Sequence, residues 1–464
     1  MEYAMIRKTA TSLAVLAVAA LSPWSAGATC YIRAGAAGLG NGSDWHNAYP
    51  SFAAAGLHAQ TSTAPRGNTY YVAGASASYG AMDFRNAASG DLAITIKKAT
   101  EQDHGTSTGW DATYGTLSAR FSATVLFRTS NWVFDGVTGG GPGRWDSGHG
   151  FYIGSTIAAA GVKVLRIDNM SRNITVRHTD MCHETDIGGT DLRDHDTFYC
   201  LGASNVTLSH CALRHAGRVH FLTANMSNVT IERCYMYRCK ESATQHAESW
   251  SDQGSSNVII RNCLFKHNMG TGVIVVLSRG GDPRISDNWQ IYGNVFLGGE
   301  RTYDCTDGII CVINSQIANN WRIYNNSFVN LRGAGGTTGL QFHSSTGGGH
   351  AIYNNIWYNC QAVSYSFGAV TAVHDYDLFI GNLRTPSQLH LQFGAGDPFA
   401  SIAGHDFNLK APTAAGKSDL GPPFDIDPYH RTRGRDGVWD RGACEFGGAP
   451  AILPEPPTNP QLLW

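Results

Sequence analysis

Histidine, glutamate and tryptophan alternate near the middle of this 464-residue chain, in the phrase QHAESWS. Side chains of a β-strand point to opposite faces in turn, so if Ala247 and Ser249 face inward, His246, Glu248 and Trp250 share the outer face. Histidine can transfer protons, glutamate can act as a second acid–base group or hold a cation, and tryptophan can stack on a sugar ring. The phrase therefore predicts acid–base chemistry on a carbohydrate.

Neighbouring phrases supply matching side chains. In RVHFLTA the same alternation points His220 outward, and Tyr199 of DTFYCLG is expected beside it. Basic side chains at adjacent turns could neutralise a substrate carboxylate and tune a nearby base. We predict His220, His246, Arg218 and Lys240 as catalytic residues, and Glu248, Trp250, Tyr199, Arg279, His215 and Arg238 as substrate-binding residues. The alternative is a solvated strand face whose polar side chains have no function.

The elements that position these residues are copies of one short phrase, which recurs seven times. The copies begin at Asn173, Asn205, Asn228, Asn257, Asn288, Asn320 and Gly349. Within a copy the apolar residues alternate, as Val206 and Leu208 do, which is the period of a strand and not of a helix. The copies follow one another at irregular intervals, so each unit is a strand with loops of variable length.

Aligning the copies places residues of one kind in columns. The seventh residues are Thr179, Cys211, Cys234, Cys263, Asn294, Asn326 and Asn355. Parallel stacking, with strands about 4.8 Å apart, would set these side chains on top of one another and bury a core that no single unit could bury. The sequence therefore predicts an all-β parallel β-helix solenoid. The three cysteines of the column are expected as stacked free thiols, whereas Cys30, Cys305, Cys311, Cys360 and Cys444 could form disulfides.

Phrases such as NVTIERC and NNSFVN resemble the coil repeats of the right-handed parallel β-helix superfamily, the pectate-lyase-like proteins. The openings YIRAGAAGLGNGSDWHNAYPSF and RGNTYYVAG and the closing DPYHRTRGRDGVWDRGACEFG resemble end segments of its secreted members. The resemblance implies a solenoid with an N-terminal cap and a C-terminal capping segment. We expect a signal peptide over 1–28, a cap and first coils over 29–130, the parallel β-helix over 131–380, and the capping segment with a proline-rich tail over 381–464. In the capping segment, a packing and ion-pair network is predicted for Asp425, Asp427, Arg433, Arg435 and Asp440.

The resemblance also implies a reaction. The commonest enzymes of the superfamily are lyases that cleave uronate-containing polysaccharides by β-elimination, often with calcium bound to carboxylates. In its alginate lyase and chondroitinase B family a Glu-x-Glu on an outer strand holds calcium. Here the corresponding phrase is His246, Ala247, Glu248, so a histidine replaces one carboxylate. That difference favours a metal-free mechanism assisted by histidine and leaves Glu248 and Asp196 as the candidate calcium ligands.

Other functions stay open. Hydrolysis needs two carboxyl groups about 5 to 9.5 Å apart, for which Glu248 could pair with Asp196 or Asp252. An epimerase would share the proton abstraction of a lyase. A glycan-binding or adhesive β-helix would use the groove without any reaction.

Composition and the first residues indicate an exported protein. Arg7 and Lys8 precede an apolar run from Leu13 to Leu21, and Ala26, Gly27 and Ala28 provide small residues for cleavage. The run is too short to cross a bilayer. A formal net charge of −2 argues against general binding to nucleic acid. We expect a secreted monomer that acts on an extracellular polysaccharide, with no nucleic-acid partner and no membrane insertion of the mature chain.

Overall fold

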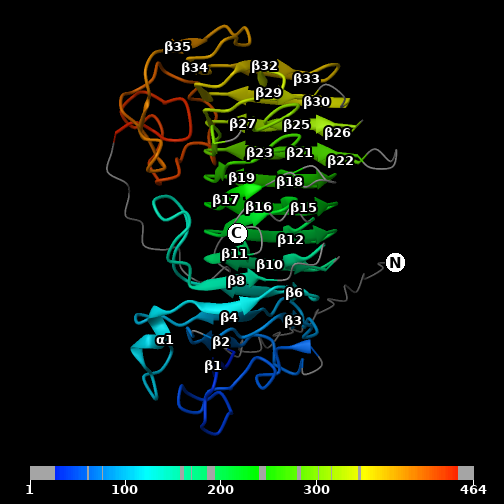
Figure 1. Ribbon diagram of the computed structural model, residues 1–464, viewed down its shortest axis with the longest axis vertical. Helices are drawn as coiled ribbons and strands as arrows, with labels where there is room; N and C mark the ends of the chain where they lie inside the picture. The colour runs from blue at the N-terminus through cyan, green and yellow to red at the C-terminus, as the bar shows by residue number, and fades with distance from the viewer. Residues whose placement is uncertain are drawn as a thin grey trace, which may run out of the picture.

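The computed structural model describes residues 27–59, 62–75, 77–156, 161–168, 170–184, 194–239, 247–278, 284–300, 302–314, 316–342 and 346–447. Within these residues, regular structure is almost all β-strand, and the one α-helix is α1 (Ala112–Thr116). The strands stack into a tall solenoid that climbs from β1 (Thr29–Ile32) to β35 (Gln392–Gly394), as Figure 1 shows. Within the same residues, no helix is long and apolar enough to span a membrane.

In the described residues the stacked strands form three parallel sheets, which we call sheets A, B and C. Sheet A contains β1, β2 (Thr69–Val72), β4 (Ile94–Lys98), β7 (Trp132–Asp135), β10 (Arg172–Arg177), β13 (Ser204–Ser209), β16 (Ser227–Glu232), β19 (Ser256–Arg261), β22 (Ile285–Asp287), β23 (Trp289–Tyr292), β26 (Ile317–Asn319), β27 (Arg322–Tyr324), β30 (Thr346–Tyr353) and β33 (Thr371–Asp375). Sheet B contains β5 (Ala119–Ser122), β8 (Phe151–Ser155), β11 (Thr179–His183), β14 (Ala212–Ala216), β17 (Tyr235–Cys239), β20 (Leu264–Lys266), β24 (Val295–Leu297), β28 (Ser327–Val329), β31 (Ile356–Tyr358), β34 (Leu378–Ile380) and β35. Sheet C contains β3 (Met82–Phe84), β6 (Val125–Phe127), β9 (Lys163–Ile167), β12 (Asp196–Leu201), β15 (Val219–Ala224), β18 (Glu248–Gln253), β21 (Ile274–Leu277), β25 (Ile310–Ile313), β29 (Thr337–Gln341) and β32 (Ala362–Ser366). A separate antiparallel pair joins β36 (Phe399–Ser401) to β37 (Asp406–Leu409).

Like side chains stack along the core, as the repeats predict. In sheet A, Val206 pairs with Val229, and Val229 with Val258, all of them buried. In sheet B, the rings of Phe328 and Trp357 stack with their centroids 3.9 Å apart. Each coil thus covers the apolar face of its neighbour, which is how a repeat too small for a core of its own becomes stable. The predicted parallel β-helix is confirmed.

The predicted inner column is continuous and buried. Along it the Cys263 N–H donates to Asn294 Oδ1 over 2.9 Å, and the Asn355 N–H donates to Asp377 Oδ1 over 2.7 Å. Side-chain oxygens therefore satisfy the main-chain N–H groups at the corner between sheets A and B, where no strand partner is available. None of the cysteines, all of which lie in the described residues, forms a disulfide, which confirms the stacked thiols and contradicts disulfides at Cys30, Cys305, Cys311, Cys360 and Cys444.

The asparagine that opens six of the seven phrases has a backbone role. Asn205, Asn228 and Asn257 have φ angles of 52°, 54° and 51°, in the left-handed region that asparagine tolerates better than most residues. Their side chains form an outer ladder, in which Asn228 Nδ2 donates to Asn205 Oδ1 over 3.0 Å. The repeated asparagine thus fixes a bend in the coils that carry it.

The C-terminal segment returns along the side of the solenoid, where it is red in Figure 1. Phe399, Phe407 and Ala443 pack on apolar residues of the outer face of sheet B, such as Val329 and Ile356. This contact explains why sheet B, unlike a solvated face, is apolar on both sides.

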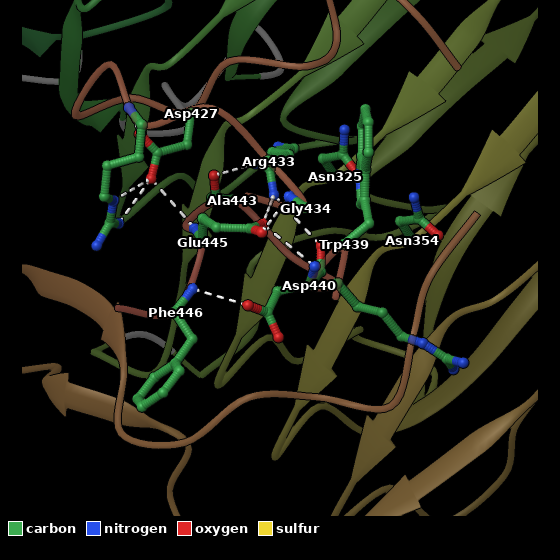
Figure 2. A network of polar contacts seen from close by, with 12 residues as sticks. Asn325, Asn354, Asp427, Arg433, Gly434, Trp439, Asp440, Ala443, Glu445 and Phe446 are labelled. Carbon is green, nitrogen blue, oxygen red and sulfur yellow. Dashed lines mark hydrogen bonds and ion pairs between the residues drawn. The ribbon is translucent and has the colours of Figure 1, made fainter. Parts of the chain in front are cut away.

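The polar residues of this segment bind one another, as Figure 2 shows. The buried Arg433 guanidinium lies 3.5 Å from Glu445 Oε2, and Asp427 forms an ion pair with Arg431. Asp440 accepts hydrogen bonds from the Thr413 and Phe446 N–H groups. The predicted network is confirmed for Asp427, Arg433 and Asp440. Among the described residues, Asp425 and Arg435 have no ion pair of their own.

The stacked strands extend beyond the range in which the sequence repeats are visible. They begin at β1, far before residue 131, and the last parallel strand is β35, beyond residue 380. The early coils carry little of the repeated phrase, so the sequence pattern alone does not reveal them.

Candidate functional site

A groove lies on the outer face of sheet C. Its volume is about 350 Å³, and it crosses β15, β18, β21 and β25. The lining residues are Arg218, Val219, Leu222, Glu248, Ser251, Thr271, Val275, Leu277, Thr306, Asp307, Ile313 and Asn314. We call it the sheet C groove. Its size falls within the range of about 300 to 1,000 Å³ that is common for ligand sites.

A half-exposed aromatic ring continues the groove toward the N-terminal end of the solenoid. Tyr199 pairs in register with Leu222, and Leu222 pairs with Ser251, so all three side chains are in one row. Lys163 Nζ lies 5.5 Å and the Arg166 guanidinium carbon 5.6 Å from the centroid of the Tyr199 ring. The row therefore presents a flat apolar ring flanked by two cations.

A buried carboxylate organises the cations beside the groove. Asp196 accepts from Arg218 Nε over 2.6 Å, and Lys163 Nζ lies 2.5 Å from Asp196 Oδ2. Asp196 is fully buried, while Arg218 and Lys163 are partly exposed. The carboxylate thus fixes the two basic side chains, and the three groups together carry one net positive charge.

Glu248 occupies the expected side of the strand. It follows Asp196 and Val219 in one register column and lines the groove, although it is largely buried. Its charge acts on Arg218, whose pKa is raised overall. Burial, the largest single effect, lowers this pKa, but hydrogen bonding and charge interactions with Asp196, together with the charge of Glu248, outweigh it. Glu248 is therefore an acidic group at a cationic rim.

The predicted outward position of His220 is wrong. The ring is fully buried, with Nε2 donating to the Tyr237 carbonyl over 3.1 Å and Nδ1 3.1 Å from Ser249 Oγ. Burial lowers the pKa of His220 to about 3, so the ring is neutral at physiological pH. Its position fits a structural hydrogen-bond donor at the corner between sheets B and C and does not reach the groove.

The predicted outward position of Trp250 is also wrong. The indole lies in the core, stacked on Phe221 at a centroid distance of 4.9 Å, and its Nε1 donates to Thr223 Oγ1. Alternation fails because adjacent residues at the start of β15 and β18 are both buried, His220 with Phe221 and Ser249 with Trp250. The register of these strands also skips the position of His220 and Ser249. The chain bends here out of sheet B, and the strict period of two begins only after the bend.

Of the two carboxylates considered as partners of Glu248 in hydrolysis, Asp252 is separated from it by the fold and Asp196 is engaged by cations. Asp252 is fully buried and accepts hydrogen bonds from Thr223 Oγ1 and Ser255, so it faces the interior while Glu248 lines the outer groove. Asp196 is held by its two cationic partners. The groove instead brings Glu248 together with Asp307, from a loop of a later coil. No sequence pattern points to Asp307, because its loop has no counterpart in the other copies.

The remaining predicted residues lie elsewhere or outside the described residues. His215 is largely buried at the end of β14 in sheet B, with its ring 5.3 Å from that of Tyr237, and burial lowers its pKa to about 4. Arg238 is half-buried in β17, also in sheet B. Neither lines the sheet C groove. The predictions for His246, Lys240 and Arg279 fall outside the described residues.

The candidate calcium ligands do not fit that ion. Both oxygens of Asp196 bind cationic side chains, which leaves Glu248 without the second carboxylate predicted for it. The part of the chain that the structure describes holds no group of three or more His, Cys, Asp or Glu side chains arranged for a metal. Calcium favours six to eight oxygen ligands. We therefore derive no chemical step through calcium.

Comparison with known proteins identifies the fold. Residues 149–296 match the family model described as "Right handed beta helix region". The search of curated proteins found no match.

Several solved structures are similar to this chain. The pectate lyase Pel9A is 12% identical, with 90% of this chain and 96% of that chain covered and a TM-score of 0.46. ORF18 of Geobacillus virus E2 is 11% identical, with 66% of this chain and 54% of that chain covered and a TM-score of 0.43, so this chain spans about half of its length. An exopolygalacturonase from Thermotoga maritima is 9% identical, with coverages of 57% and 73% and a TM-score of 0.35. These values are too low to support a functional conclusion. Because the matched repeats lie in three stacked parallel sheets, the chain has the fold of a right-handed parallel β-helix.

Proposed function

We propose that the outer face of sheet C binds an acidic extracellular polysaccharide and cleaves it. The observation that carries the proposal is the Tyr199 ring, which lies next to Lys163 and Arg166 of β9 and in line with a groove lined by Arg218 and Glu248. Aromatic rings stack on the apolar faces of sugars, and the cations would attract their carboxylates. The row runs across successive coils, so it suits an extended chain better than a single small molecule.

The reaction that we propose is β-elimination on a uronate residue. Arg218 would neutralise the uronate carboxylate and so make the neighbouring proton easier to remove, since its guanidinium is held by Asp196 at the edge of the groove. His246 and Lys240 remain the proposed proton acceptors. They precede Glu248 by two and eight residues in the sequence. His220 has no part in this proposal because it is buried.

Hydrolysis is the second candidate, and the shared position of Glu248 and Asp307 favours it. Two carboxyl groups in one groove can act as general acid and as base or nucleophile on a glycosidic bond. The largely buried Glu248 and the exposed Asp307 would supply these two carboxyl groups.

The test is an activity screen of the purified protein on acidic and neutral polysaccharides, with and without a chelator. An unsaturated product that absorbs in the ultraviolet identifies elimination, whereas new reducing ends without that absorbance identify hydrolysis. Binding without either product would leave a glycan-binding protein and refute the proposed cleavage.

Two substitutions locate the chemistry. Glu248→Gln and Asp307→Asn keep the shape of the groove and remove one charge each, and in the hydrolytic mechanism each should lower kcat/KM by roughly 100-fold or more. In the eliminative mechanism Asp307→Asn should change kcat little, because Arg218 carries the electrostatic step. Asp91→Asn changes an exposed carboxylate in an early coil and serves as the matched control. Full activity of both groove variants would refute the hydrolytic mechanism in the sheet C groove.

Export is part of the proposal and rests on the sequence. The basic residues, apolar run and small residues of segment 1–28 support a cleaved signal peptide. N-terminal sequencing of the protein recovered from the medium or periplasm of the producing cells would test this, with Thr29 as the expected first residue. We further propose that the mature protein is a monomer, which its mass in solution would check.

A further inference from the structure

A second pocket lies on the other side of the solenoid, between sheet B and the C-terminal segment. It has a volume of about 440 Å³ and is lined by Lys266, His267, Leu297, Gly298, Gly299, Glu300, Asn330, Arg332, Asn359, Ile402, Ala403 and His405. We call it the sheet B pocket. None of its residues lines the sheet C groove.

A glycine opens the sheet B pocket within a column of large side chains. The residues that follow paired strands of sheet B are His267, Gly298, Asn330 and Asn359, one in each successive coil. A Cβ at Gly298 would lie 2.3 Å from Asp304 Oδ2, so the buried Asp304 carboxylate excludes a side chain there. Gly298 thus makes room for the Asp304 carboxylate, and the pocket opens beside it, between the histidine and the asparagines.

Two cations of the pocket, Lys266 and Arg332, can bind an anion. Glu300 is the carboxylate among the lining residues, and the buried Asp304 carboxylate lies behind Gly298. Glu300 Oε1 lies 2.5 Å from His267 Nε2 and 3.7 Å from Lys266 Nζ. Arg332 is exposed, and its main-chain N–H donates to Asp304 Oδ2 over 2.8 Å. Lys266 Nζ also lies 2.9 Å from His405 Nε2, whose pKa is lowered by burial and by that lysine, so His405 adds no positive charge at neutral pH.

The rest of the lining suits a sugar better than a simple anion. Asn359 Nδ2 donates to Asn330 Oδ1 over 2.9 Å. The Asn330 NH₂ group and the Asn359 carbonyl oxygen do not take part in this bond, so they can bind sugar hydroxyl groups as donor and acceptor. Leu297, Ile402 and Ala403 add an apolar surface for C–H groups. Polar groups of both senses next to an apolar wall are typical of a site for a small polar ligand.

We propose that the sheet B pocket binds a single carboxylated sugar residue, with its carboxylate on Arg332 and Lys266 and its hydroxyls on Asn330, Asn359 and Glu300. The proposal does not depend on the reaction at the sheet C groove, because it concerns binding alone. It gives this protein a second point of attachment to an acidic polysaccharide, on a different face of the solenoid from the one that would cleave it.

The test is calorimetric titration of the full-length mature protein with sodium glucuronate, with glucose and sodium acetate as comparison ligands. We expect glucuronate to bind in the millimolar range and to bind at least ten times more tightly than either comparison ligand. Equal binding of glucose would refute the role of the carboxylate, and equal binding of acetate would refute the role of the sugar. No glucuronate binding at all would refute the proposal.

Variants then place the bound sugar. Arg332→Gln removes the exposed cation and should weaken glucuronate binding about tenfold, while Ala403→Phe fills the hollow from an exposed position and should abolish it. Arg172→Gln, at an exposed arginine of β10 in sheet A, is the matched control. Glu248→Gln should leave glucuronate affinity unchanged even if it disables cleavage. If Glu248→Gln weakens binding and the two pocket variants do not, the sugar binds in the sheet C groove and the proposal fails.

Discussion

The replacement of His220 by glutamine distinguishes a buried structural histidine from a surface catalytic one. Glutamine has a similar reach and can keep a hydrogen bond to the Tyr237 carbonyl, but it cannot take up a proton in this pH range. We expect it to lower the free energy of unfolding by about 1 to 2 kcal/mol at pH 7.5, from imperfect packing and hydrogen bonding in a fully buried site.

The pH dependence follows from the shifted pKa. The usual histidine pKa is near 6.5, and in the folded protein burial lowers that of His220 to about 3. Between these values the unfolded chain binds a proton that the folded protein does not, so stability is lost as the pH falls through 6.5 toward 3. At pH 4.5 this linkage removes about 3 kcal/mol relative to pH 7.5, because each pH unit in that range is worth about 1.4 kcal/mol.

The order of stability of the wild-type protein and the His220→Gln variant should therefore reverse between pH 7.5 and pH 4.5. The variant is expected to be less stable at pH 7.5 and more stable by about 1 kcal/mol at pH 4.5, because only the wild type carries the proton linkage. Urea unfolding at pH 7.5, 6.0 and 4.5 measures the difference in the free energy of unfolding between the two proteins. The other buried histidines are the same in both proteins, so their contributions cancel in this difference. His46→Gln, at an exposed residue of the N-terminal segment, should keep the wild-type pH dependence.

A parallel pH dependence in wild type and His220→Gln would refute the buried, neutral state of this ring. If the variant kept full stability at every pH and lost turnover instead, the surface role expected from strand alternation would be restored.

Two further perturbations test the fold around the site. Asn326→Leu removes four hydrogen bonds of the inner column, among them Asn326 Nδ2 to the Ile291 carbonyl at 2.8 Å, and should cost about 3 to 5 kcal/mol in urea unfolding. The exposed ladder variant Asn359→Ser should cost less than about 1 kcal/mol, and equal losses would contradict the assigned burial. Burial raises the pKa of Glu445 to about 7, so its contribution to stability is present below the usual value near 4.5 and is lost as the pH rises to 7. Limited proteolysis of the C-terminal segment should therefore be faster at pH 8 than at pH 5, and Glu445→Gln should reduce that difference; an unchanged difference would rule out Glu445 as its source.

Much of the architecture was predictable from the sequence because the repeats carry it locally. A strand period, a repeated asparagine with a left-handed backbone and a column of cysteines followed by asparagines all depend on stacking one coil on the next. Each coil buries its apolar residues against the next coil in the same way, so an alignment of the chain with itself shows which residues stack.

The site was predictable only in part. The sequence correctly places Tyr199 and Glu248 on the outer face of sheet C, with Arg218 beside them. It places His220 and Trp250 on the wrong side, because the period of two does not hold where the chain bends from sheet B into sheet C.

The sequence by itself thus determined the parallel β-helix, the stacked inner column and the polar network of the C-terminal segment. Only the tertiary structure decided which polar side chains reach solvent and which distant residues meet, as Asp307 meets Glu248 in the sheet C groove and Ile402 meets Lys266 in the sheet B pocket. The physical reason is that stacking depends on a regular period within each coil, whereas a site depends on corner geometry and loop lengths, which differ from coil to coil and leave no repeated pattern.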